Sequence, residues 1–395
     1  MSRTISDKMA NLKPSAVREI LKVTSDPSFI AFAAGNPSAE TFDVTALKKL
    51  CDSTLDAAAL QYGVTEGYPP LREMLAKRYG TKYGLFNAEA DDVIVTAGGQ
   101  QVINLVAQSL LNEGDAVICE NPSFVGALNT FRAYNAKLVG VHMDGEGMLI
   151  DRLEAALKAE PRAKLIYTIP TFQNPGGTTM PVERRKQMLE LAKKYDVMIL
   201  EDSPYFELSF GEAAPPAIKS LDTDGYVIFA GSFSKIVSPG IRVGFSVAPK
   251  WISSKMTVAK QNQDVHTNGV FQRVIYKWLR DFNVDAHIAK CAGLYKKKSG
   301  LMLKMMDELF DKRVTYTRPA GGLFLWCDLP EGYNGSELAK AMTEKKVAIV
   351  PGTAFDVNED VNNRGFRLNY SVPSEKQIET GITILADGIR AYLTK

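Results

Sequence analysis

The chain has 395 residues, which suffices for a large domain with its own core and a smaller companion, since single cores stop growing at roughly 250 to 300 residues. Hydrophobic residues make up 45% of the chain and charged residues 23%, a composition typical of soluble globular proteins rather than disordered ones. The net charge is only +2, from 47 Lys and Arg against 45 Asp and Glu. This balance gives no electrostatic case for a nucleic acid partner and favours a small-molecule substrate.

Cysteine usage and the opening segment indicate a cytoplasmic protein. Cys51, Cys119, Cys291 and Cys327 are widely scattered, with neither the paired spacing of a zinc site nor the density of a disulfide scaffold. The N-terminus lacks the apolar region of a signal peptide, and no later segment is long and apolar enough to span a bilayer. None of the three histidines stands at metal-ligand spacing, so we expect no metal site.

The middle of the chain repeats one pattern in which a short Val- and Ile-rich run is followed by small or polar residues and then an amphipathic stretch. This alternation of strand-like and helix-like segments predicts a parallel sheet covered by helices. The clearest helices are 101–111 and 182–195, the latter with Pro181 at its start. The expected strands are 93–97, 116–119, 164–169, 197–200, 226–230 and 243–247.

From about Ala286 the pattern changes to a long Lys-rich helix, then an alternating strand over 314–328 and further short elements, which reads as a second, α+β domain. The extended segment around 30–37 precedes the sheet and is expected to fold back onto this second domain. The expected division is a joining segment over 1–45, a large domain over 46–285 and a small domain over 286–395.

Chemically useful side chains follow five of the predicted strands. Ligands of an open parallel sheet bind beyond the carboxyl ends of its strands. The first strand leads through two glycines directly into a helix, an arrangement that exposes backbone N–H groups to an anion. The later strands supply an aromatic ring, an amide, a carboxylate, a phenol, a lysine and an arginine. The residues in question are Gly98, Gly99, Gln100, Phe124, Asn174, Asp202, Tyr205, Ser232, Ser234, Lys235 and Arg242.

Each residue alone has an ordinary explanation: the glycines form a tight turn, Asp202 caps a helix, and Lys235 is a solvated lysine. Their convergence is informative, because one kind of cofactor needs an anchored phosphate, a stacked ring, a carboxylate beside a ring nitrogen and a lysine at an aldehyde.

The sequence resembles the fold type I, class I/II aminotransferases, which use pyridoxal phosphate, and most closely their 2-aminoadipate and kynurenine aminotransferase branch. The motifs span nearly the whole chain in the order of that family. They are YGVTEGYPPLR (62–72), TAGGQQ (96–101), NPSF (121–124), QNPGG (173–177), EDSPY (201–205), GSFSKIVSPGIRVGF (231–245), PAGGLFLW (319–326) and FRLNYS (366–371). The resemblance implies a large domain with a mainly parallel seven-stranded sheet flanked by helices, plus a smaller α+β domain.

The resemblance also assigns roles. Lys235 would hold the cofactor as a Schiff base, Asp202 would pair with its ring nitrogen, and Phe124 would stack on the ring. Asn174 and Tyr205 would hold its phenolic oxygen. The phosphate would be bound by Gly99, Gln100, Ser232, Arg242 and Tyr62 of a partner subunit. The substrate carboxylate would be bound by Arg367, with help from Asn174 and the backbone of Gly35. Gly99 departs from the Ser or Thr frequent in the family, which removes a hydroxyl contact but leaves the backbone N–H.

The expected reaction moves an amino group between an L-amino acid, such as glutamate, 2-aminoadipate or an aromatic or branched-chain amino acid, and a 2-oxo acid such as 2-oxoglutarate. Arg18 could meet a distal substrate carboxylate or be a solvated helix residue. A β-lyase or decarboxylase on the same scaffold is the alternative enzyme. An effector-sensing half of a transcription regulator is disfavoured, because the chain begins almost directly at the aminotransferase-like part. The implied assembly is a homodimer with shared active sites.

Overall fold

The computed structural model describes residues 5–6, 9, 26–211, 213–358 and 363–394. Its main feature is a mixed sheet with the strand order β2-β9-β8-β7-β6-β3-β4-β5. Strands β3, β4, β6, β7 and β8 run parallel to their neighbours in that group, whereas β9 is antiparallel to both β2 and β8. The strand bounds are β2 (Asp91–Thr96), β3 (Ala116–Asn121), β4 (Lys137–Asp144), β5 (Gly147–Met148), β6 (Ala163–Thr168), β7 (Met198–Asp202), β8 (Val227–Ser232) and β9 (Gly244–Pro249).

All six strands expected from the sequence are present, but the sheet has eight strands rather than seven. The two-residue strand β5 adds an eighth by pairing antiparallel with β4 at the edge. Strand β4 itself was not among the expected runs. Most of its side chains are exposed or partly exposed, so its sequence lacks the continuous apolar run of a strand that is buried on both faces.

Helices cover both faces of this sheet. Alternation along the strands sends Val117 and Cys119 into a core with α5, α6 and α10, and sends Ala116 and Ile118 into a core with α7 and α8. Helix α5 begins two residues earlier than expected, and α8 has the expected bounds. The helices are α3 (Val44–Asp52), α4 (Pro69–Tyr83), α5 (Gly99–Leu110), α6 (Val125–Ala133), α7 (Ile150–Ala159), α8 (Val182–Tyr195), α9 (Ile218–Leu221), α10 (Lys250–Gln263) and α11 (Gly269–Asp281).

The C-terminal part forms a four-stranded sheet, β10-β11-β14-β13, packed with helices. The single strand expected over 314–328 is wrong: β10 and β11 are separated by a turn in which Pro319 lacks an N–H and Gly322 has φ +75. The elements are α12 (Val284–Leu309), β10 (Thr315–Tyr316), β11 (Phe324–Asp328), α13 (Gly335–Glu344), β12 (Val347–Ala348), β13 (Val350–Pro351), η3 (Gly352–Phe355), β14 (Gly365–Asn369) and α14 (Glu375–Leu393).

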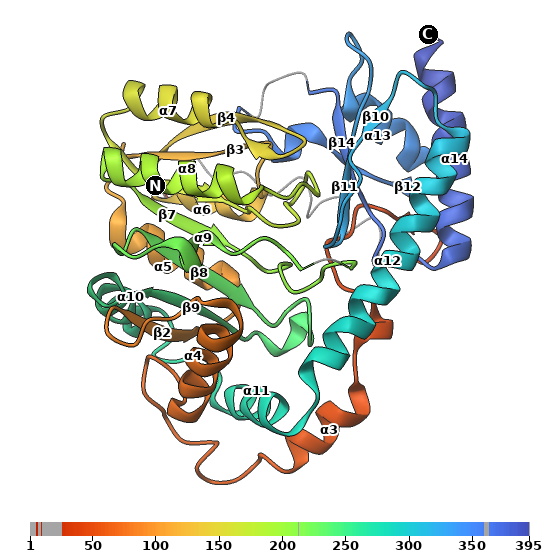
Figure 1. Ribbon diagram of the computed structural model, residues 1–395. Helices are drawn as coiled ribbons and strands as arrows, with labels where there is room; N and C mark the ends of the chain where they lie inside the picture. The colour runs from red at the N-terminus through yellow and green to blue at the C-terminus, as the bar shows by residue number, and fades with distance from the viewer. Residues whose placement is uncertain (1–4, 7–8, 10–25, 212, 359–362, 395) are drawn as a thin grey trace, which may run out of the picture.

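Two segments connect the sheets. Helix α12 runs from the side of α11 to α14, along the edge of the molecule in Figure 1. The N-terminal segment follows the same edge, because β1 (Ile30–Ala31) pairs in parallel with β12 before η1 (Ala39–Thr41) and α3 lead to the large sheet. No helix in the described part of the chain has an apolar stretch of the length needed to cross a membrane.

Candidate active site

A cavity of about 270 Å³ lies beyond the carboxyl ends of β6, β7 and β8, between the large sheet and the four-stranded sheet. Eleven of the residues to which the resemblance assigns a role line it, although they come from segments up to about 330 residues apart. They are Gly35, Gly99, Gln100, Phe124, Asn174, Asp202, Tyr205, Ser232, Lys235, Arg242 and Arg367. Asn36, Ile103, Val125, Ile169, Pro204 and Ser234 complete the lining.

One end of the cavity is built to receive an anion. Helix α5 points its N-terminus there, and Gly98 precedes it with φ +83, a conformation that glycine adopts without strain. The guanidinium of Arg242 donates to the carbonyl oxygen of Ala97 at 2.7 Å. A Cβ at Gly98 would come within 2.6 Å of Arg242 Nη2, and a Cβ at Gly99 would enter the space between Asp202 and Ser232. Glycine at position 98 therefore leaves room for the Arg242 guanidinium, whereas a Cβ at position 99 would make only ordinary contacts of 3.9 Å.

Asp202 ends β7 and is buried, with one carboxylate oxygen fixed by a side chain from the neighbouring strand. The hydroxyl of Tyr167 on β6 donates to Asp202 Oδ2 at 2.8 Å. Burial raises the pKa of Asp202 to about 6, and the Tyr167 bond and the nearby Lys235 oppose this rise. A carboxylate in such a place favours a cationic ligand group, because a positive charge restores its ionised form.

Lys235 follows β8 and directs its amine into the cavity. Its Nζ donates to the carbonyl oxygen of Gly35 at 2.9 Å and lies 5.9 Å from the ring centre of Tyr205. Burial, followed by the charges of Arg367 and Arg242, lowers the pKa of Lys235 to about 8. A substantial fraction of this amine is therefore neutral near physiological pH, the form that can act as a nucleophile or a base.

Arg367, on β14, holds an unpaired positive charge at the other end of the cavity. Its guanidinium donates to Asn174 Oδ1 and to the carbonyl oxygen of Ala33, each at 2.9 Å, and stacks 4.3 Å from the ring centre of Phe324. Only 2% of Arg367 is exposed, yet no carboxylate among the described residues forms an ion pair with it and its Nε has no partner. Burial lowers the pKa of Arg367 to about 10. Such a guanidinium is suited to bind a carboxylate from a ligand.

One residue that the resemblance assigns to the cofactor, Tyr62, is not in the cavity. Tyr62 is 80% exposed and contacts the ring of His266, so within this chain it does not reach the site. Arg18 lies outside the described residues.

The structure also reveals two buried residues that sequence reasoning missed, Tyr167 and Glu120. Glu120 near the end of β3 accepts hydrogen bonds from Thr168 Oγ1 at 2.6 Å and from Gln173 Nε2 at 2.9 Å, and thereby supports the turn that carries Asn174. Burial raises the pKa of Glu120 to about 7. The available signal was an acidic residue at the end of a wholly apolar strand, the same signal that identified Asp202.

Comparisons with known proteins agree with this geometry. The family described as "Aminotransferase class I and II" matches residues 27–385. Aromatic-amino-acid aminotransferase 1 of Thermococcus litoralis is 39% identical over 99% of this chain and 95% of its own length.

Two solved structures share the fold and cover 99% of this chain and 98% of their own. One is Pyrococcus horikoshii kynurenine aminotransferase in complex with PMP, at 38% identity and a TM-score of 0.95. The other is Thermus thermophilus alpha-aminoadipate aminotransferase complexed with N-(5'-phosphopyridoxyl)-L-leucine, at 34% identity and a TM-score of 0.90. The expected fold type I architecture is confirmed, and the chain belongs to the class I and II aminotransferases.

Proposed function

We propose that this aminotransferase exchanges an amino group between an L-amino acid and a 2-oxo acid, with pyridoxal 5'-phosphate held on Lys235. The observation that carries the proposal is the convergence of Lys235, Asp202 and Arg367 on one cavity. The expected division into residues 1–45, 46–285 and 286–395 is part of the proposal, with the cavity between the last two parts.

The anion end of the cavity fits the phosphate of this cofactor. Gly99 and Gln100 begin helix α5, Arg242 supplies the positive charge, and Ser232 supplies a hydroxyl. The side chain of Gln100 is occupied by Gly126 and Thr130, so its contribution would be its backbone N–H.

The middle of the cavity fits the cofactor ring. Phe124 supplies an aromatic face, and Asp202 supplies a buried carboxylate for a protonated ring nitrogen. Asn174 and Tyr205 offer an amide and a phenol beside them for the phenolic oxygen. The far end fits the substrate carboxylate. This carboxylate would accept a hydrogen bond from Arg367 Nε, which has no partner, and would neutralise the buried guanidinium.

When bound, pyridoxal phosphate supplies a carbonyl for the substrate amine and an electron sink for the substrate Cα. Asp202 keeps the ring nitrogen protonated through its buried carboxylate. Arg367 and Asn174 orient the substrate by its carboxylate. Lys235 would act as the base that moves the proton of Cα, because its amine in the cofactor-free protein has a pKa of about 8, close to the working pH.

Glutamate and 2-oxoglutarate are our first candidate pair, and 2-aminoadipate, aromatic and branched-chain amino acids are the further donors to test. The names of the relatives include aromatic amino acid, 2-aminoadipate and kynurenine aminotransferases, which supports a broad panel. These relatives favour transamination over the β-lyase or decarboxylase alternative. The cytoplasm is the compartment we propose, because all four cysteines are free thiols.

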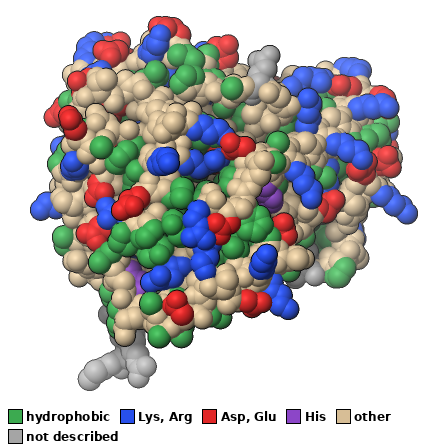
Figure 2. Space-filling model, turned by 60° about the horizontal axis from the view of Figure 1, so that its bottom comes forward, with side chains coloured by type: hydrophobic (Ala, Val, Ile, Leu, Met, Phe, Trp, Pro, Cys, Tyr) green, Lys and Arg blue, Asp and Glu red, His purple; other side chains and the backbone are tan. Residues whose placement is uncertain are grey.

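We also infer a homodimer in which Tyr62 reaches the site of the partner subunit. The segment between α3 and α4 is at the bottom of Figure 1 and exposes Leu60, Tyr62 and Val64 by 72%, 80% and 52%. Figure 2 brings the bottom forward and shows hydrophobic side chains gathered among Lys and Arg side chains on that face. Subunits carrying Lys235→Ala should be inactive and those carrying Tyr62→Ala should retain the cofactor poorly. When the two variants are mixed and their subunits exchange, each mixed dimer has one site with both side chains intact, so activity should return. If each subunit used its own Tyr62, mixing would restore no activity.

The decisive experiment is an absorbance spectrum of the purified protein before and after L-glutamate, then with a panel of 2-oxo acids. A yellow band that glutamate bleaches and one oxo acid restores would establish the half-reactions and name the acceptor. A band that glutamate leaves unchanged would direct the test to the aromatic and branched-chain donors, and release of pyruvate or carbon dioxide from an amino acid would favour the lyase or decarboxylase. A colourless protein that ignores added cofactor would overturn the proposal.

A further inference from the structure

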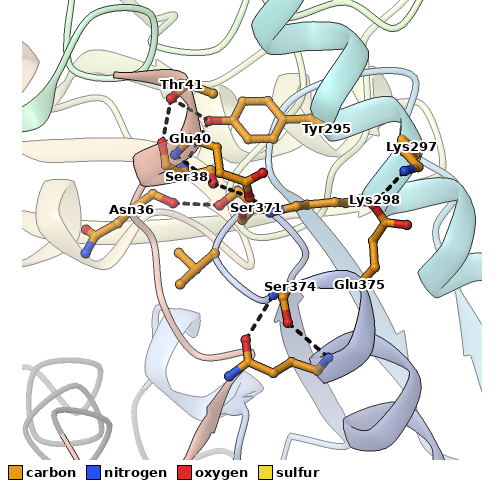
Figure 3. Close-up of polar contacts among 12 residues, drawn as sticks. Asn36, Ser38, Glu40, Thr41, Tyr295, Lys297, Lys298, Ser371, Ser374 and Glu375 are labelled. Carbon is orange, nitrogen blue, oxygen red and sulfur yellow. Dashed lines mark hydrogen bonds and ion pairs between the residues drawn. The ribbon is translucent and has the colours of Figure 1, made fainter. Parts of the chain in front are cut away.

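Lys298, in the middle of α12, is a buried lysine outside the cavity. Only 2% of its side chain is exposed, and its ammonium donates to Glu40 Oε1 at 2.7 Å and to the carbonyl oxygen of Ser371 at 3.1 Å. Figure 3 shows these three residues meeting from three different segments. Lysine is rarely buried unless it is paired, so this position needs an explanation from the segments that it joins.

One of these segments, residues 30–41, we call the strap. Its backbone carbonyls provide acceptors for both functional cations of the cavity. The carbonyl oxygen of Ala33 accepts from Arg367 Nη2, and that of Gly35 accepts from Lys235 Nζ, each at 2.9 Å. The position of the strap therefore sets the direction of the carboxylate-binding guanidinium and of the reactive amine.

Helix α12 holds the end of the strap with two side chains one turn apart. Tyr295 accepts from the backbone N–H of Ser38 at 3.1 Å, and Lys298 pairs with Glu40. The Ser38 hydroxyl also donates to Glu40 at 3.1 Å, so the two contacts share one carboxylate. Figure 3 shows the resulting continuous set of polar contacts.

The third segment is the loop after β14, the strand that carries Arg367. Lys298 holds this loop through the carbonyl oxygen of Ser371. The hydroxyl of Ser371 in turn donates to the carbonyl oxygen of Asn36 at 2.6 Å, and Asn36 lines the cavity. The ammonium thus joins the strap to the loop directly after the arginine strand, in addition to the backbone bond from the Asn369 N–H to the carbonyl oxygen of Phe32 at 2.8 Å.

We propose that Lys298 is a positioning residue for substrate carboxylate binding, holding the strap so that Ala33 and Gly35 face Arg367 and Lys235. This inference rests on the proposed function, because it assumes that Arg367 binds the substrate. Without the ammonium, Glu40 and Ser371 lose their common partner and the strap can shift. The Arg367 guanidinium then loses its fixed orientation. Because every substrate has the same α-carboxylate, the affinity for all substrates falls by the same factor.

The test compares Lys298→Met with Lys297→Met in the holoenzyme. Both substitutions keep an unbranched stem and remove one positive charge from the same helix. Lys297 pairs with Glu375 at 2.7 Å on the surface, where its side chain is 66% exposed, so it is a matched control (Figure 3). Binding is measured from the absorbance change on adding 2-methyl-L-glutamate or α-methyl-L-phenylalanine. These probes have no Cα proton to lose, and they share the amine, the α-methyl group and the α-carboxylate but differ in the side chain.

We expect Lys298→Met to weaken both probes by about tenfold, as for loss of one charge-assisted interaction, with cofactor retention unchanged. Lys297→Met should stay within about twofold of the native protein, as surface pairs contribute little. Lys298→Arg should recover part of the affinity. The double variant Lys298→Met/Glu40→Gln should bind no worse than Lys298→Met alone, because the two residues act through one contact.

Native affinity in Lys298→Met, equal loss in Lys297→Met, or loss for only one probe would overturn the inference. If Lys298→Met fails to fold, Glu40→Gln gives the same test, with weakened binding of both probes expected and native affinity contradicting it. Failure of the proposed function looks different, because the native protein itself would then show no cofactor absorbance, or would release pyruvate or carbon dioxide instead of transferring the amino group.

Discussion

The substitution Arg367→Met tests whether Arg367 binds a ligand or mainly stabilises the fold. Burial lowers the pKa of Arg367 from 12.5 to about 10, which corresponds to about 3 kcal/mol of unfavourable free energy for keeping the charge at neutral pH. Methionine removes that cost, but leaves Asn174 and Ala33 without a donor at about 1–2 kcal/mol each. The terms nearly cancel, so stability should change by no more than about 2 kcal/mol. Loss of a bidentate carboxylate contact should lower kcat/KM by about 10²- to 10⁴-fold.

Arg185→Met is the matched control for this prediction. Arg185 is equally buried, but it donates to the carbonyl oxygens of Met180 and Pro170, both at 2.8 Å, and its guanidinium lies 3.9 Å from Glu201. Removing it takes the nearby positive charge from buried Glu201, which then keeps only the backbone N–H groups of Ile218 and Lys219, and removes a donor from several carbonyls, at a cost of about 3–5 kcal/mol. The assays are the thermal midpoint of the cofactor-free protein and steady-state kinetics of the holoenzyme. If Arg367→Met unfolded like Arg185→Met, or kept full activity, the assignment of Arg367 as the carboxylate-binding residue would be wrong.

Three further outcomes follow from the other end of the cavity. Lys235→Met should abolish turnover. The lowered pKa of Lys235 gives the native cofactor-free protein a stability contribution that is complete above pH 10.5 and is lost as pH falls through about 8. In urea denaturation, the change in the free energy of unfolding from pH 7 to pH 10 should therefore be less favourable in this variant than in the native protein. Gly98→Ala should weaken cofactor binding by more than about tenfold in equilibrium dialysis, because its Cβ strikes Arg242 and its φ is +83. Tyr167→Phe should raise the pKa of Asp202, because it removes a hydrogen bond that lowers it. The acid limb of the holoenzyme's pH–rate profile should then move to higher pH, and an unshifted limb would contradict the role of this bond.

Much of the site could be predicted because local sequence places it. Each apolar run that becomes a buried parallel strand ends at the same edge of the sheet, so Asn174, Asp202 and Lys235 had to meet once the strands paired. The glycines before α5 were informative for the same reason, since a strand followed directly by a helix exposes N–H groups there. The edge strand β4 was missed, because a half-exposed strand carries no continuous apolar run.

What only the tertiary structure decided depends on contacts between residues far apart in the chain. The hydroxyl of Tyr167 could face either side of its strand until the register with β7 placed it on Asp202. Nothing in the local sequence marks Lys298 as buried, and its partners Glu40 and Ser371 are 258 and 73 residues away. Sequence periodicity specifies which face of an element is apolar, whereas the partner of a buried polar group is fixed only when separate elements pack.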